Sequence, residues 1–313
     1  MVSPRHDIEL QSDLPPRGRR RPEYDSLTLR ELFTRVRSGA LPEGVVHRLM
    51  SGYVRTIVPP RPSSEPRPDG EYEDQYKCCP PPIALIILSI IEIIVFIVDV
   101  SATGSTYSVS GPVASACIYD PHRRYEAWRF LSYSLVHIGE MHIIMNLAVL
   151  LLLGIPLEMV HGWWRVLSVY FSGVVLGSLL TSISDPTVYL AGASGGVYSI
   201  LTAHIATIIM NWSDMALPWL QLGVFMLLIT ADLGTAIYQR YVAKLDLQVG
   251  YVAHLGGALA GLLVGIYILR NLNLKKWERW LWWAALIAYI LLMGVCIVWN
   301  IAFPDYFPPP HYN

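Results

Sequence analysis

The stretch Gly192-Ala193-Ser194-Gly195-Gly196-Val197-Tyr198 opens a long apolar segment in the second half of the chain. A later apolar segment opens with Ala253-His254-Leu255-Gly256-Gly257. Both segments reach the roughly 20 residues that an α-helix needs to cross a bilayer. The sequence therefore predicts two membrane-spanning helices, one with a glycine-flanked serine at its start and one with a histidine near its start.

The composition extends this reading to most of the chain. Of its 313 residues, 53% are hydrophobic and only 15% are charged, which is too apolar for a soluble globular protein of this size. Apolar runs of spanning length lie near 82–101, 140–160, 163–184, 193–212, 216–238, 250–270 and 278–303. We therefore expect an all-α polytopic membrane protein, built as a bundle of seven transmembrane helices.

Charge divides the chain into parts. Because 13 of the 23 Lys and Arg residues precede residue 78, we expect a cytosolic region 1–80, a membrane domain 81–303 and a short non-cytosolic tail 304–313. A second basic cluster consists of Arg270, Lys275, Lys276 and Arg279. An even number of predicted crossings separates the two clusters, so the positive-inside rule places both in the cytosol. No basic stripe indicates a nucleic-acid partner.

The N-terminal region carries two weaker signals. Residues 1–25 and 58–71 have the composition of disordered segments, whereas Thr28 and Glu31 have the spacing of a capping box before a short amphipathic helix. Cys78 and Cys79 precede the first span, where they are either sites of S-palmitoylation or unmodified thiols.

The predicted topology places the polar residues of several helices at one depth. His142 and Asn146 fall in the first two turns of the second helix, Ser194 begins the fourth, and His254 lies about one turn into the sixth. These three helices start on the lumenal or extracellular side. At 1.5 Å of rise per residue, all four side chains are expected within roughly 10 Å of that surface.

Ser194 and His254 have the chemistry of a nucleophile and its base. A serine in a membrane helix often serves only for packing, but Gly192 and Gly195 allow backbone and ligand to approach this hydroxyl closely. An intramembrane histidine is costly and indicates a functional site, although a neighbouring carbonyl can also satisfy it. Tyr198, four residues after Ser194, is expected either to stack beneath the imidazole or to pack as an ordinary core aromatic.

Gly257 and Gly261 follow His254 on the same helix face. Small residues at this spacing let two membrane helices pack closely. We therefore expect the sixth helix to pack on the fourth and to bring His254 toward Ser194.

His142 and Asn146, four residues apart, present two hydrogen-bond donors that suit a developing oxyanion. His137 raises the alternative of a zinc site. However, His137 and His142 are five residues apart, Glu140 is poorly placed, and no cysteine or carboxylate completes a ligand set. We expect no metal and no cofactor.

Two further motifs are Trp128-Arg129 and Gly154-Ile155-Pro156-Leu157-Glu158. Together and in this order, the motifs over residues 83–303 resemble the rhomboid family of intramembrane serine proteases, in the animal secretase type with six core helices and one C-terminal helix. The resemblance implies Ser194 as nucleophile and His254 as base without a third acid. It also implies an oxyanion hole of Asn146, His142 and the Ser194 backbone N–H, and structural roles for Trp128, Arg129 and Glu158.

The resemblance further implies that single-pass membrane proteins are cut near the outer end of their transmembrane helix, releasing ectodomains such as EGF-type growth-factor precursors. A helix must unwind before its amides can be attacked. The expected location is a secretory-pathway membrane (Golgi, endosome or plasma membrane), with the site facing the lumen or exterior. A catalytically inactive rhomboid-like client-binding protein and a seven-helix transporter or receptor are the alternatives. The sequence assigns no role to Glu92, Asp99 or Asp232.

Overall fold

The computed structural model describes residues 52, 75–76, 81–243, 250–271 and 275–311. The predicted helix near Thr28 and the cysteines Cys78 and Cys79 lie outside the described residues, so both expectations stay predictions. In the described part of the chain, the only extended pairing is one antiparallel bridge between Tyr119 and Leu190.

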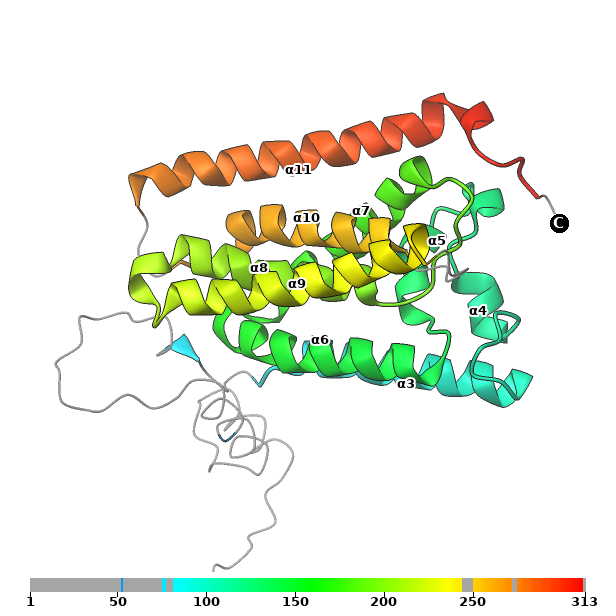
Figure 1. Cartoon of the computed structure of the whole chain (residues 1–313), viewed down its shortest axis with the longest axis horizontal. Helices are drawn as coiled ribbons and strands as arrows, with labels where there is room; N and C mark the ends of the chain where they lie inside the picture. Colours follow the sequence, from blue (N-terminus) through cyan, green and yellow to red (C-terminus); the bar gives the residue numbers. More distant parts are fainter. Residues whose placement is uncertain (1–51, 53–74, 77–80, 244–249, 272–274, 312–313) are drawn as a thin grey trace, which may run out of the picture. The chain divides into compact units, whose positions relative to one another are not determined.

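In the described part of the chain, seven apolar helices form the bundle (Figure 1). In chain order they are α3 (Ala84–Thr103), α6 (Glu140–His161), α7 (Trp163–Ser184), α8 (Ser194–Met210), α9 (Pro218–Tyr241), α10 (Tyr251–Ile268) and α11 (Lys276–Ala302). Six of them are long and apolar enough to cross a membrane, and α8 is a shorter apolar helix of 17 residues. The predicted all-α polytopic bundle is confirmed.

A local backbone conformation explains why the short helix α8 does not begin before Ser194. Gly192 has a φ of +120°, a conformation that an α-helix cannot contain, so the helix begins only at Ser194. With 17 residues it is about 25 Å long at 1.5 Å per residue, which is less than a bilayer core of about 30 Å. The remaining depth is therefore covered by polypeptide beyond the ends of this helix.

The same helix is the centre of the bundle. Residues along nearly its whole length are buried, and α10, α7, α6 and α9 all pack against it. Figure 1 shows α8 and α10 between α11 on one side and α6 with α3 on the other. Side chains on α8 are thus positioned by neighbours on several sides.

Glycines allow α10 and α8 to approach at backbone distance. A Cβ atom on Gly257 would overlap the Gly195 carbonyl, and one on Gly261 would overlap the Ser199 carbonyl. Only small residues permit such contact between membrane helices. The contact fixes the height of His254, one turn before Gly257, relative to Ser194.

The segment between α3 and α6 folds into short helices at one end of the bundle: α4 (Pro112–Cys117), η2 (Pro121–Arg123), α5 (Arg129–Ser132) and η3 (Tyr133–Leu135). Arg129 is buried, and its guanidinium donates to the carbonyls of Ser115 and Ile118 at 3.1 and 2.9 Å and to Glu126 at 2.5 Å. Trp128 is exposed and donates to the Ala116 carbonyl. These bonds tie the start of α5 to α4.

Asp99 connects α3 to the same segment. Its carboxylate accepts from the backbone N–H groups of Val113 and Ala114 at 2.8 and 2.9 Å, so it caps the N-terminus of α4. This contact between two helices explains an acidic residue that the sequence left without a role.

Two other acids have structural partners inside the bundle. Glu158 on α6 accepts from the N–H groups of Ala84 and Leu85 at 2.9 and 3.1 Å, and so satisfies the first donors of α3. Glu92, fully buried on α3, accepts from the Tyr170 hydroxyl at 3.1 Å. Both acids therefore hold α3 against α6 and α7.

The end of α11 and the residues that follow it contact the segment between α3 and α6 and the end of α7. Asn300 accepts from Arg124 at 3.2 Å and donates to Ser182 at 2.8 Å. The Arg124 guanidinium lies 3.3 Å from the ring centroid of Phe307. These contacts link α11, α7 and the end of η2, and the sequence did not predict them.

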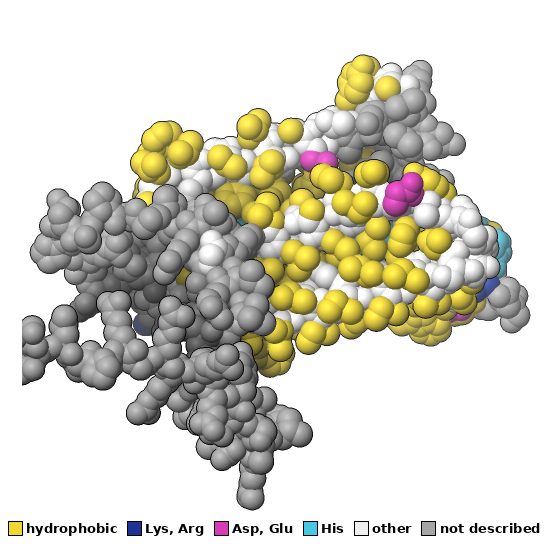
Figure 2. All heavy atoms as spheres, turned by 90° about the horizontal axis from the view of Figure 1, so that it is seen from below, with side chains coloured by type: hydrophobic (Ala, Val, Ile, Leu, Met, Phe, Trp, Pro, Cys, Tyr) yellow, Lys and Arg dark blue, Asp and Glu magenta, His cyan; other side chains and the backbone are white. Residues whose placement is uncertain are grey.

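The outward faces of the helices suit a lipid environment. None of the apolar stretch Pro218–Thr235 of α9 is buried, and isoleucines such as Ile94 and Ile97 on α3 are exposed. Figure 2 shows one face of the bundle dominated by hydrophobic side chains. A multi-pass membrane protein needs such a surface, because lipid tails cannot solvate polar groups.

Candidate active site

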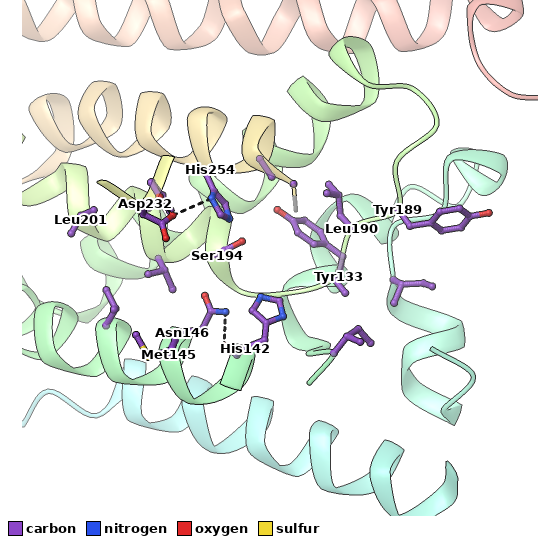
Figure 3. A pocket seen from close by; sticks show the side chains of 18 of the residues that line it. Tyr133, His142, Met145, Asn146, Tyr189, Leu190, Ser194, Leu201, Asp232 and His254 are labelled. Carbon is purple, nitrogen blue, oxygen red and sulfur yellow. Dashed lines mark hydrogen bonds and ion pairs between the residues drawn. The ribbon is translucent and has the colours of Figure 1, made fainter. Parts of the chain in front are cut away.

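One cavity collects the candidate residues of the site. It has a volume of about 730 Å³ and receives side chains from α6, α8, α9 and α10. Its polar residues include His142, Asn146, Ser194, Tyr198, Asp232 and His254, and Figure 3 shows all of them except Tyr198 as labelled side chains around one space. The first turns of α6, α8 and α10 thus meet a later part of α9 at this cavity.

Ser194 is the first residue of α8. Its hydroxyl has no hydrogen bond to any described residue, and Figure 3 shows it between His254 on one side and Asn146 and His142 on the other. By helix geometry the first N–H groups of α8 have no intrahelical acceptor. The same backbone therefore presents a free hydroxyl and unpaired donors to the cavity.

The glycines beside Ser194 are required by space. A Cβ on Gly192 would lie 2.6 Å from Cε1 of His142, and its φ of +120° is one that other residues rarely adopt. A Cβ on Gly195 would lie 2.9 Å from the Tyr133 hydroxyl. Both glycines allow the start of α8 to lie directly against neighbouring side chains.

His142 and Asn146 face Ser194 from α6 (Figure 3). The Asn146 amide donates one hydrogen to the His142 carbonyl at 2.9 Å, which fixes its orientation. A primary amide carries a second N–H. The two side chains can thus offer donors on the side of Ser194 opposite His254.

His137 contacts the backbone directly before Ser194. Its Nε2 accepts from the Ala193 N–H at 3.3 Å, and its ring packs edge-on against His142 with centroids 5.2 Å apart. Burial lowers the pKa of His137 to about 3, so the ring is neutral and able to accept. Among the described residues, no group of three His, Cys, Asp or Glu side chains could hold a metal ion. The absence of a metal stays a prediction.

His254 stacks on Tyr198, with ring centroids 4.5 Å apart and planes inclined by 15°. Its side chain is 12% exposed, and its Nδ1 lies 3.7 Å from Oδ2 of Asp232. The Tyr198 hydroxyl donates to the same carboxylate oxygen. The resemblance implies His254 as base without a third acid, and the structure places the Asp232 carboxylate beside this imidazole.

Asp232 is the site residue that sequence reasoning missed. The signal was present, since an acid inside an apolar run is uncommon. The residues that contact Asp232 could not be predicted from the sequence, because these contacts depend on how α9 is rotated against α8 and α10.

The assembled groups have the chemistry of serine acyl transfer. A free hydroxyl, an imidazole and convergent amide donors are the parts that this reaction needs. Trp128, Arg129 and Glu158 lie outside the cavity lining and make the structural contacts described above.

Comparison with known proteins places this chain in a family. The Rhomboid domain model matches residues 124–271. Rhomboid-related protein 2 of Mus musculus is 36% identical over 236 residues, covering 74% of this chain and 78% of that protein. The chain belongs to the rhomboid family. The resemblance inferred from the motifs is thereby confirmed.

Other rhomboids show how far the likeness extends. Rhomboid-related protein 3 of Homo sapiens is 36% identical over 74% of this chain, which spans 59% of that protein's length. Inactive rhomboid-related protein 2 of Caenorhabditis elegans is 35% identical over 71% of this chain and 64% of that protein. The more distant Rhomboid-type serine protease 2 of Emericella nidulans is 31% identical over 47% of this chain and 28% of that protein. The names include proteases and an inactive member, so activity must be argued from the site.

Proposed function

We propose that this rhomboid is an intramembrane serine endopeptidase, which cleaves single-pass membrane proteins near the outer end of their transmembrane helix and releases the ectodomain. The observation that carries the proposal is the position of Ser194. It begins α8 two residues after Gly192 and directly before Gly195, and it faces a cavity that it shares with His254, His142 and Asn146. A purely client-binding protein needs no such set.

The proposed reaction assigns each group a step. Ser194 Oγ attacks the scissile carbonyl while His254 takes its proton, and the new oxyanion accepts from Asn146, His142 and the Ser194 N–H. Collapse breaks the C–N bond, and His254 returns the proton to the leaving amine. Water then attacks the acyl-enzyme by the same route and regenerates Ser194.

The cavity also supports a proposal on the form of the substrate. Its apolar lining includes Met145 and Val149 from α6, Leu201 from α8 and Leu228 from α9. A helical substrate has its amides bonded internally and must open locally before attack. An unwound, mainly apolar segment with small residues fits this lining, and EGF-type growth-factor precursors are the class that the family resemblance suggests.

The predicted topology supports a proposal on which side of the membrane the active site faces. With the basic N-terminal region in the cytosol, the starts of α6, α8 and α10 face the lumen or exterior. We place the enzyme in a secretory-pathway membrane, with the released product leaving on the non-cytosolic side.

Active-site labelling tests the proposal. The full chain in liposomes is incubated with a fluorophosphonate probe and with a single-pass reporter protein. Wild type should cleave the reporter and carry the probe on Ser194 by mass spectrometry, whereas Ser194→Ala should do neither. Ser199→Ala is the matched control, because Ser199 is a buried α8 serine bonded to the Gly196 carbonyl. It should behave as wild type. A wild-type chain that binds the reporter without labelling or cleavage would support the inactive, client-binding alternative.

A further inference from the structure

Asp232 lies in the apolar helix α9, where a charged side chain is unfavourable and usually marks a functional site. The side chain is 62% exposed and contributes to the wall of the cavity around Ser194. The reaction proposed above makes no use of it.

The contacts of Asp232 join three helices at one oxygen atom. Its Oδ2 accepts from the Tyr198 hydroxyl on α8 and lies 3.7 Å from Nδ1 of His254 on α10. Tyr198 also stacks on the His254 ring. The tyrosine therefore fixes both the plane of the imidazole and the position of the carboxylate beside it.

The direction of the imidazole decides what this contact can do. Figure 3 shows the His254 ring between Asp232 and Ser194, with Nδ1 toward the carboxylate. Nε2 is then the nitrogen left to face Ser194. Nδ1 is buried and makes no hydrogen bond to any described residue, and the Asp232 carboxylate is an acceptor close to it. The separation of 3.7 Å exceeds a normal N–H···O distance, and catalytic hydrogen bonds often tighten only when substrate binds.

We infer that Asp232 is a positioning residue, which holds His254 as the Nδ1–H tautomer and stabilises the imidazolium formed during the reaction. The inference rests on the proposed function. The Ser194 proton moves to Nε2 of His254 and the Nδ1–H bond stays intact, so Asp232 takes no proton in this step. Ser194 and His254 remain the reacting pair, and Asp232 acts on the reaction only through His254.

A merely structural role makes a different prediction. If Asp232 only tied α9 to α8 through Tyr198, its loss would loosen α9 and change access to the cavity. Access alters KM and the entry of small probes, whereas the orientation of the base alters kcat.

Kinetics of the full chain in liposomes separate the two roles. Asp232→Asn should lower kcat by about tenfold to hundredfold, less than for a fully buried triad aspartate. KM should stay within about twofold, and the rate of fluorophosphonate labelling should fall with kcat. Asp232→Glu should recover most of kcat, because it restores the negative charge. Should Asp232→Asn fail to insert, Asp232→Ala provides the same comparison.

Thr230→Val is the matched control on α9. Thr230 is exposed, and its hydroxyl bonds only to carbonyls of its own helix, Met226 and Leu227, so wild-type kinetics are expected. Wild-type kcat in Asp232→Asn, or a change confined to KM, would overturn the inference. Ser194→Ala, measured in parallel, distinguishes failure of the proposed function from failure of the inference about Asp232. An active Ser194→Ala overturns the proposed function and the inference with it, whereas an inactive Ser194→Ala beside a fully active Asp232→Asn overturns the inference alone.

Discussion

Gly261 of α10 lies so close to Ser199 of α8 that a Cβ atom on the glycine would overlap the serine carbonyl. The obstacle is backbone, which cannot rotate away as a flexible side chain can. The positions of His254 and Ser194 therefore depend on a helix contact that begins one turn beyond the site and continues to Gly261.

Gly261→Ala tests this dependence. Forcing a methyl group into a closely packed contact is expected to destabilise the bundle by about 1–3 kcal/mol and to lower the cleavage rate. Gly294→Ala is the matched control, because a Cβ on Gly294 of α11 meets nothing within 4 Å. It should stabilise the protein by up to about 1 kcal/mol through helix propensity alone. Thermal unfolding in detergent measures both, and equal effects of the two variants would contradict the account.

His137 predicts a loss of stability in acid. Its pKa in the folded chain is lowered to about 3 by burial, against about 6.5 when unfolded. The unfolded state therefore binds a proton first as the pH falls. The stabilisation is present above pH 6.5 and is lost progressively toward pH 3.

The corresponding comparison is between wild type and His137→Gln. The amide can still accept from the Ala193 N–H but does not titrate. Unfolding midpoints measured from pH 7 to pH 4 should fall less steeply in the variant. A slope identical to wild type would show that His137 is not the titrating group.

Metal removal provides a separate expectation. His137 is engaged with the Ala193 backbone, and the described residues offer no ligand set. Treatment with EDTA or o-phenanthroline should leave cleavage of a reporter unchanged. Activity that disappears on chelation and returns with added zinc would restore the metal interpretation of His137 and His142.

The substrate should respond to helix stability. A glycine in a helix interior costs about 1 kcal/mol relative to alanine, so two near the cut lower the cost of opening by roughly 2 kcal/mol, or about thirtyfold in rate. Replacing such a pair by leucine should nearly stop cleavage. Introducing a pair into an uncleaved single-pass protein should create a substrate for wild type and not for Ser194→Ala. Cleavage that follows only the residues bordering the scissile bond would rule out this view of recognition.

The helices could be predicted because run length is a local property of the sequence. Each of the seven runs became a helix with bounds close to those expected. The grouping of His142, Asn146, Ser194 and His254 around one cavity also followed from local information. Each of them lies near the start of its helix, and alternate helices start on the same side.

The polar contacts between helices could not be predicted in this way. Asp99 caps α4, Asp232 adjoins His254, and Asn300 bridges Ser182 and Arg124. Each contact depends on the rotation of one helix relative to another, which apolar run lengths do not determine. An acid in an apolar run indicated that a partner exists without indicating which residue it is.

The central claim is that Ser194 and His254 act together as nucleophile and base. The most direct measurement is ectodomain release from a cleavable reporter by wild type, Ser194→Ala, His254→Ala and the double variant, at equal expression and membrane insertion. Each single variant should abolish release, and the double variant should be no worse than either, because the two groups act as one unit. Substantial release by well-folded Ser194→Ala would contradict the account.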